Sequence, residues 1–136
     1  MVNRLYETIL IVDKHAKFRA SLKGYLRARL QHVKVLEASS EKAGVRTAVK
    51  ERPDVALIDA ESGGSATASA IRRTCPRCKN IILANEAAAV LCKAAKNNGI
   101  VAYVDKKDIV TKLLPILDKQ LPKNGACGRR SLKSHR

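Results

Sequence analysis

The sequence predicts an α/β fold in which helices cover both faces of a parallel sheet. Short apolar runs alternate along the chain with segments of helical periodicity, which is the pattern of repeated βαβ units. Two of the apolar runs end abruptly in a carboxylate, at Asp13 and at Asp59. The chain has 136 residues, enough for one domain with a substantial core and too few for two.

Five segments are expected to be strands because they are short and rich in Ile, Leu and Val. Four of them lack the alternation of a half-buried strand, so they are expected to be buried on both faces, as in parallel sheets. The second segment does alternate and should be a more exposed strand. The expected strands are residues 8–12, 33–37, 55–59, 80–84 and 100–104.

Helices are expected in the segments between and after these strands. The first is amphipathic, the third has little apolar surface, and Pro115 should kink the last one or break a hydrogen bond there. Pro53 stops the second helix, and Gly99 is the expected cap of the fourth. The expected helices are residues 15–30, a segment from Ser39 or Ser40 to Glu51, 67–73, 86–97 and 108–121.

The formal net charge of +15 is the compositional anomaly. A charge this large attracts polyanions such as nucleic acid at long range but does not determine a fold. No acid follows Asp118, and residues 122–136 are polar, basic and without periodicity. We expect residues 1–121 to form the domain and 122–136 a disordered basic tail.

The four cysteines come without a secretory signal or an apolar segment long enough to span a membrane, so we expect a reduced, cytoplasmic protein. Cys75 and Cys78 have the spacing of half a zinc knuckle. No second such pair completes it, and the pattern therefore argues against zinc.

In open α/β sheets, ligands bind beyond the carboxyl ends of the strands where the strand order reverses. For the flavodoxin-like order 2-1-3-4-5 this point lies between strands 1 and 3. Asp13 and Asp59 then face each other, with Lys14 beside Asp13, Ala84 at the end of strand 4 and Lys106 just beyond strand 5. Such a crevice suits Mg²⁺ or a phosphoryl group, although acids also follow strands as caps or turn formers. His15, near the start of the first helix, is expected to be a surface or capping residue.

These residues resemble the receiver domains of two-component response regulators over about residues 7–121. The resemblance implies a flavodoxin-like (βα)5 three-layer sandwich. The motifs that carry it are Ile9-Leu10-Ile11-Val12-Asp13 before a Phe-Arg helix, Arg52-Pro53-Asp54-Val55-Ala56-Leu57-Ile58-Asp59, Ile81-Ile82-Leu83, and Gly99 leading to Ala102-Tyr103-Val104-Asp105-Lys106.

The resemblance implies a role for each matched position. Asp59 stands where the family accepts a phosphoryl group from a histidine kinase, and Asp13 matches the first of two acids that help to bind Mg²⁺. Lys106 matches the lysine that contacts the phosphoryl group. Tyr103 matches the aromatic residue whose rotation reports activation.

Two functional positions depart from the family pattern. Lys14 replaces the second acid, so its ammonium either opposes Mg²⁺ at Asp13 and Asp59 or itself occupies the crevice. Ala84 replaces the switch Thr or Ser and cannot donate to a phosphoryl oxygen. Gly63 replaces the loop Pro, and Glu61 either supplies a substitute metal ligand or is a solvated loop acid.

We therefore expect a stand-alone atypical receiver that acts by contact with a histidine kinase or a downstream effector, through helix 4, strand 5 and helix 5. Mg²⁺-dependent phosphorylation of Asp59 should be impaired, no other cofactor is expected, and homodimerisation stays open. The alternatives are a competent phosphoacceptor, acting as carrier or sink, and a nucleic-acid-binding protein.

The nucleic-acid alternative depends on the tail and on the stripe Arg19, Lys23 and Arg27. With so few aromatic residues, no stacking surface for single strands is apparent, so only non-specific phosphate contacts are expected. We expect no enzyme with a turnover of its own, because the sequence has neither a Ser-His-Asp nor a Cys-His constellation nor a P-loop.

Overall fold

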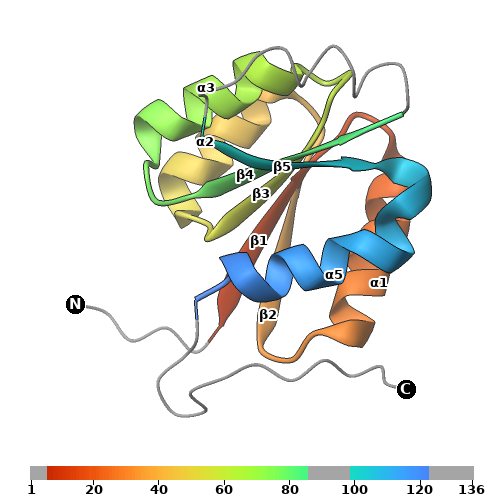
Figure 1. Ribbon diagram of the computed structural model, residues 1–136. Coiled ribbons are helices and arrows are strands. Elements are labelled where there is room, and N and C mark those ends of the chain that lie inside the picture. Colours follow the sequence, from red (N-terminus) through yellow and green to blue (C-terminus); the bar gives the residue numbers. More distant parts are fainter. Residues whose placement is uncertain (1–5, 86–98, 123–136) are drawn as a thin grey trace.

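A five-stranded parallel sheet lies between two layers of helices (Figure 1). The computed structural model describes residues 6–85 and 99–122. The elements, in chain order, are β1 (Glu7–Val12), α1 (Ala16–Arg29), β2 (Val33–Ala38), α2 (Glu41–Glu51), β3 (Val55–Asp59), α3 (Gly64–Thr74), β4 (Lys79–Ala84), β5 (Ile100–Asp105), the 3₁₀ helix η1 (Lys106–Asp108) and α5 (Ile109–Gln120).

The strand order is β2-β1-β3-β4-β5, and every neighbouring pair is parallel. The predicted order, the five strands and the α/β class are therefore confirmed. The predicted helix at 86–97 lies outside the described residues, as does the predicted tail apart from Pro122. None of the helices in the described residues is long and apolar enough to cross a membrane.

Each strand of the sheet interior buries both of its faces. In β1, Ile9 and Ile11 pack with the apolar side chains of α1 and α5, whereas Leu10 and Val12 pack with those of α2 and α3. Figure 1 shows the same division, with α1 and α5 on one face of the sheet and α2 and α3 on the other. Burial from both sides explains why these strands are continuous apolar runs without alternation.

Local signals set most helix boundaries. The Ser40 hydroxyl accepts from the Ala43 amide at 3.1 Å and caps α2, as predicted. Helix α3 begins at Gly64 instead of the predicted Thr67, because Gly63 and Gly64 both adopt positive φ angles, 98° and 43°, and turn the chain directly into the helix.

Pro115 lies within α5, which continues through it to Gln120. Of the two predicted effects, the missing hydrogen bond follows from the residue itself. A proline has no amide hydrogen to donate, so Pro115 gives none to the carbonyl four residues earlier in the helix. The apolar face of α5 holds the helix in place through Ile109, Leu113 and Leu117, all buried.

The strand register brings the predicted acids together. Val12 pairs with Ile58, so the residues that follow them, Asp13 and Asp59, are neighbours at the carboxyl edge of the sheet. At the same edge, Ala84 pairs with Asp105, and Lys106 comes next in the chain.

Candidate functional site

Lys106 lies between the two acids at the carboxyl edge of the sheet. Its Nζ is 2.8 Å from Asp59 Oδ1 and 3.1 Å from Asp13 Oδ2. The two carboxylates are almost completely buried, with 1% of Asp13 and 2% of Asp59 exposed. Two buried carboxylates side by side repel each other, and the ammonium between them compensates part of that charge.

The remaining carboxylate oxygens also have polar partners. Asp13 Oδ1 accepts from the His15 amide at 2.8 Å and lies 2.8 Å from His15 Nδ1. Asp59 Oδ2 accepts from the Ser62 hydroxyl at 2.9 Å. All four oxygens of the acid pair are thus engaged by groups of the chain itself.

Lys106 remains a cation in this setting. Burial lowers its pKa, but the hydrogen bonds and negative charges of Asp59 and Asp13 outweigh burial and leave the pKa above its ordinary value. The ammonium also lies over the ring of Phe18 in α1, 4.2 Å from its centroid, in cation–π geometry. The side chain is therefore held from both sides, by the acids and by the ring.

Lys14 does not occupy the crevice. Its side chain is exposed, and within the described residues it forms neither a hydrogen bond nor an ion pair. The contribution of Lys14 comes from its backbone, whose amide donates to the Ser62 hydroxyl at 3.0 Å. Of the two roles expected for the Lys14 ammonium, occupation of the crevice is therefore wrong, because Lys106 takes that place.

Three other predicted positions lie in β4, in β5 and in the turn after β3. Ala84 ends β4 as a buried side chain without a polar group. Tyr103, in β5, is half-buried and packs against the apolar cluster beneath α2 and α3. Glu61 is exposed, and its Oε2 accepts from the side-chain amide of Asn85 at 3.0 Å, which holds it at the rim next to the end of β4.

The receiver resemblance implies a magnesium ion here. Side-chain atoms of Asp13, His15 and Asp59 lie within 4.8 Å of one another, close enough to share a metal. Mg²⁺ takes hard oxygen ligands, commonly one or two carboxylates together with water, and Asp13 and Asp59 can supply these. Lys106 is hydrogen-bonded to both carboxylates and competes with a cation for them.

Two residues of the site, Ser62 and His15, were missed by sequence reasoning. Ser62 lies in the turn after β3, and its backbone amide donates to the Asp59 carbonyl at 3.0 Å. This turn brings the serine hydroxyl next to the Asp59 carboxylate. His15 is exposed and directly precedes α1, as expected for a surface residue. Its side chain makes no cap hydrogen bond, and its contact with Asp13 was not predicted.

The CxxC pair gives no sign of metal chemistry. Cys75 and Cys78 are buried free thiols in the segment that joins α3 to β4. Burial raises the pKa of Cys78, so this thiol stays protonated and is a poor metal ligand.

A model of the response regulator receiver domain family matches residues 9–118. The chain belongs to this family. The match covers the sheet, the acid pair and Lys106. No curated protein was found to be significantly similar to the chain in sequence.

Solved receiver structures share the fold. The Vibrio cholerae chemotaxis protein CheY4 has 20% sequence identity and a TM-score of 0.72, over 85% of this chain and 99% of that one. The receiver domain protein from Clostridium thermocellum has 22% identity and a TM-score of 0.71, over 84% and 93%. The isolated receiver domain of RcsB from Salmonella enterica serovar Typhimurium has 20% identity and a TM-score of 0.70, over 84% and 89%.

Proposed function

We propose that this receiver domain signals by protein contact, and that its Mg²⁺-dependent phosphorylation at Asp59 is impaired. Membership of the receiver family supports a role in two-component signalling. What distinguishes this chain from the family pattern is Lys14 in place of the second acid and Ala84 in place of the switch Thr or Ser.

The loss of an acidic ligand at Lys14, next to an acid pair whose oxygens all have partners, is the observation that carries the proposal. A phosphoryl acceptor needs a free carboxylate oxygen to attack phosphorus. In Asp59, Oδ1 is bound to Lys106 and Oδ2 to the Ser62 hydroxyl. Recruiting a metal and a phosphoryl donor would break these contacts, and Lys14 adds positive charge to the approach instead of a ligand.

The response to phosphorylation should also be weak. In the family, a hydroxyl at the end of strand 4 contacts the phosphoryl group and couples it to the switch aromatic. Ala84 offers no hydroxyl, so a phosphoryl group at Asp59 would not draw the end of β4 toward itself. Tyr103 would then receive no signal from that movement. The domain then stays near one conformation, and its partner recognises that conformation.

The partner is a signalling protein, such as a histidine kinase or a downstream effector. The part of the predicted contact surface that the structure describes is β5 and α5, where Val101 and Val110 are exposed apolar side chains. We propose no turnover for this domain.

The test is incubation with acetyl phosphate and Mg²⁺, followed by intact-mass measurement. We expect the wild-type chain to gain well under one phosphoryl group per molecule in an hour. The double variant Lys14→Asp, Ala84→Thr restores the missing acid and hydroxyl, and it should gain a phosphoryl group substantially faster.

Asp59→Asn is the control in both backgrounds, since it removes the acceptor and should abolish any gain. Rapid stoichiometric phosphorylation of the wild-type chain that Asp59→Asn abolishes would overturn the impairment. That result would favour the alternative, a competent phosphoacceptor acting as carrier or sink. The short Lys106–Asp59 contact is compatible with that alternative, and the similar RcsB receiver was solved with the phosphomimetic BeF₃⁻.

A further inference from the structure

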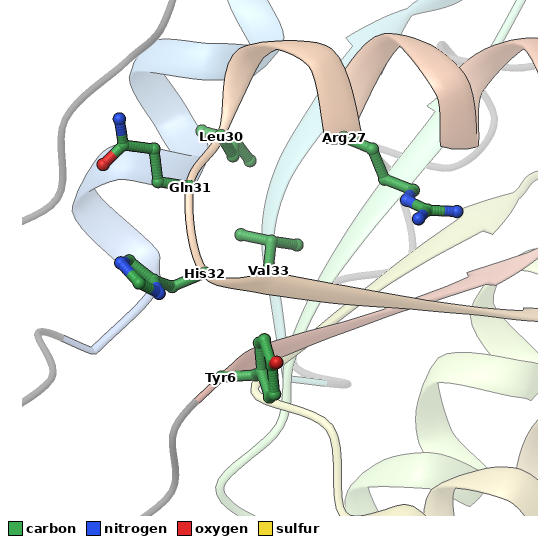
Figure 2. A pocket seen from close by; sticks show the side chains of 6 residues that line it. All are labelled: Tyr6, Arg27, Leu30, Gln31, His32 and Val33. Carbon is green, nitrogen blue, oxygen red and sulfur yellow. The ribbon is translucent and has the colours of Figure 1, made fainter.

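A groove lies at the opposite edge of the sheet from Asp59, where β1 and β2 begin (Figure 2). Two adjoining hollows of about 420 and 290 Å³ share Tyr6, Arg27 and Val33 in their lining. Figure 2 shows Arg27 on α1 above the groove, Tyr6 before β1 below it, and His32 in the turn that joins α1 to β2. Because β1 and β3 run parallel, this groove is separate from the crevice at their carboxyl ends.

The lining of the groove is cationic. It includes Lys23 and Arg27 from α1 and Lys34 from β2, and no acid is among its lining residues. Arg27 is exposed, and its side chain forms no ion pair with any residue in 6–85 or 99–122. The other two cations have outlying acid partners, Glu37 for Lys23 at 3.3 Å and Glu51 for Lys34 at 3.4 Å. Exposed pairs of this kind exchange readily for a stronger anion.

The groove also contains the most exposed aromatic ring of the chain. Of its four aromatic residues, Phe18, Tyr25 and Tyr103 are half-buried against the core clusters, whereas 51% of Tyr6 is exposed. An exposed aromatic ring leaves a large apolar area in water, and a planar ligand that stacks on the ring removes that area from solvent. Tyr6 lines the same hollow as Arg27 and Lys34, so a surface for base stacking and groups that bind phosphate occur together.

We propose that this groove binds single-stranded nucleic acid, with a base stacked on Tyr6 and the backbone phosphates on Lys23, Arg27 and Lys34. An aromatic platform within a cationic groove is the combination that holds single strands without sequence preference. The net charge of +15 adds long-range attraction to the polyanion. The proposal does not depend on phosphorylation at Asp59.

A nucleic acid fits this surface better than an acidic peptide does. Carboxylates would satisfy the cations, but they would leave the Tyr6 ring uncovered. A nucleotide places a planar base and an anion one sugar apart, which matches a ring flanked by cations. The structure thus supplies the stacking residue that the sequence did not reveal, since Tyr6 precedes the first strand and belongs to no periodic pattern.

The experiment measures binding of the full chain to a fluorescein-labelled twelve-nucleotide oligo-dT by fluorescence anisotropy across a salt series. Three phosphate contacts should contribute a slope of about −2 in log affinity against log salt. Tyr6→Leu removes the stacking ring and should weaken binding by about tenfold or more, whereas Tyr6→Phe keeps the ring and should retain it. Arg27→Gln should weaken binding and reduce the slope.

Arg46→Gln is the matched control for charge, because Arg46 is an exposed cation on α2, on the other face of the sheet. It should change affinity much less than Arg27→Gln. Equal losses from the two arginine variants, with no loss in Tyr6→Leu, would overturn the groove and leave only diffuse attraction. Equal competition by an oligo-glutamate peptide of the same charge would also overturn it, in favour of an acidic protein partner.

A second measurement keeps the proposal testable if Tyr6→Leu fails to fold. In ¹H–¹⁵N spectra of the wild-type chain, oligo-dT should shift the amide signals of residues 31–35 and leave that of Asp59 unchanged. Shifts centred on Asp59, or shifts absent from residues 31–35 at saturation, would contradict the assignment.

Discussion

The two edges of the sheet place charge in opposite ways. At the carboxyl edge, the acids are buried and every oxygen of Asp13 and Asp59 has a partner within the chain. At the amino edge, the cations are exposed around a half-exposed ring, and Arg27 has no anion beside it in the described residues. The buried acids of the first edge are satisfied within the chain, whereas the second edge presents Arg27 and two cations in solvent-accessible ion pairs.

This difference indicates which edge can bind readily. A ligand at the acid pair must first break hydrogen bonds to buried groups, and it loses their energy before it gains its own. A polyanion at the amino edge displaces only water, counterions and exposed ion pairs. The acid pair is thus already satisfied within the chain, whereas the amino edge offers exposed cations to a ligand.

Lys106→Met should give the largest effect, because it leaves two buried carboxylates without their shared cation. We expect the free energy of unfolding at pH 7 to fall by about 3 kcal/mol, the cost typical of removing one partner from a buried pair. Urea denaturation measures it. The loss should narrow on acidification, because protonating one carboxylate removes the repulsion between Asp13 and Asp59.

The wild-type pair also has a defined behaviour at high pH. Because the pKa of Lys106 is raised, its stabilisation is complete below the ordinary lysine pKa and is lost as pH rises through the raised value. Lys112→Met is the matched control, since Lys112 is exposed and lies 3.6 Å from a single acid, Asp108. It should change stability by less than about 0.5 kcal/mol. Equal losses in the two variants would mean that the bridge contributes nothing.

The sequence predicts the framework of the carboxyl edge better than its details. Strand ends are visible as apolar runs that stop at Asp13 and Asp59, and family likeness adds Lys106, so these three residues and the strand order follow from the sequence. The directions of side chains in turns are not periodic. For that reason the contacts of Ser62 and His15 with the acids were missed, and the exposure of the Lys14 side chain became apparent only from the structure.

Ser62→Ala tests the neutral donor at the same carboxylate and should have a smaller effect. Asp59 Oδ2 and the Lys14 amide each lose a partner, but the ammonium at Oδ1 remains. We expect a loss of about 1 kcal/mol in urea denaturation. Ser21→Ala, at an exposed position of α1, should change stability by less than about 0.5 kcal/mol. If the two variants were equally stable, the Ser62 hydroxyl would not support Asp59.

Glu37→Gln removes the partly exposed carboxylate that pairs with Lys23 of the groove, and it should have the smallest effect on stability. Burial raises the pKa of Glu37, but hydrogen bonds and charges from Arg19 and Lys23 lower it further and leave it below its ordinary value. The carboxylate therefore stabilises the fold above its unfolded pKa, and this contribution is lost as pH falls through the lowered pKa. Because 31% of the side chain is exposed, the loss at pH 7 should stay below about 1 kcal/mol.

The pH series for Glu37→Gln separates electrostatics from packing. In urea denaturation, the difference from the wild-type chain should shrink in 1 M salt and vanish once acid has protonated Glu37 in both folded and unfolded chains. A difference that persists in acid would assign the effect to packing. Releasing Lys23 from its 3.3 Å contact should also tighten oligo-dT binding, so the same substitution weakens the fold and strengthens the groove. A loss of fold stability together with a gain in oligo-dT affinity is expected only if the oligonucleotide binds at the exposed cations and not at the crevice of the buried acid pair.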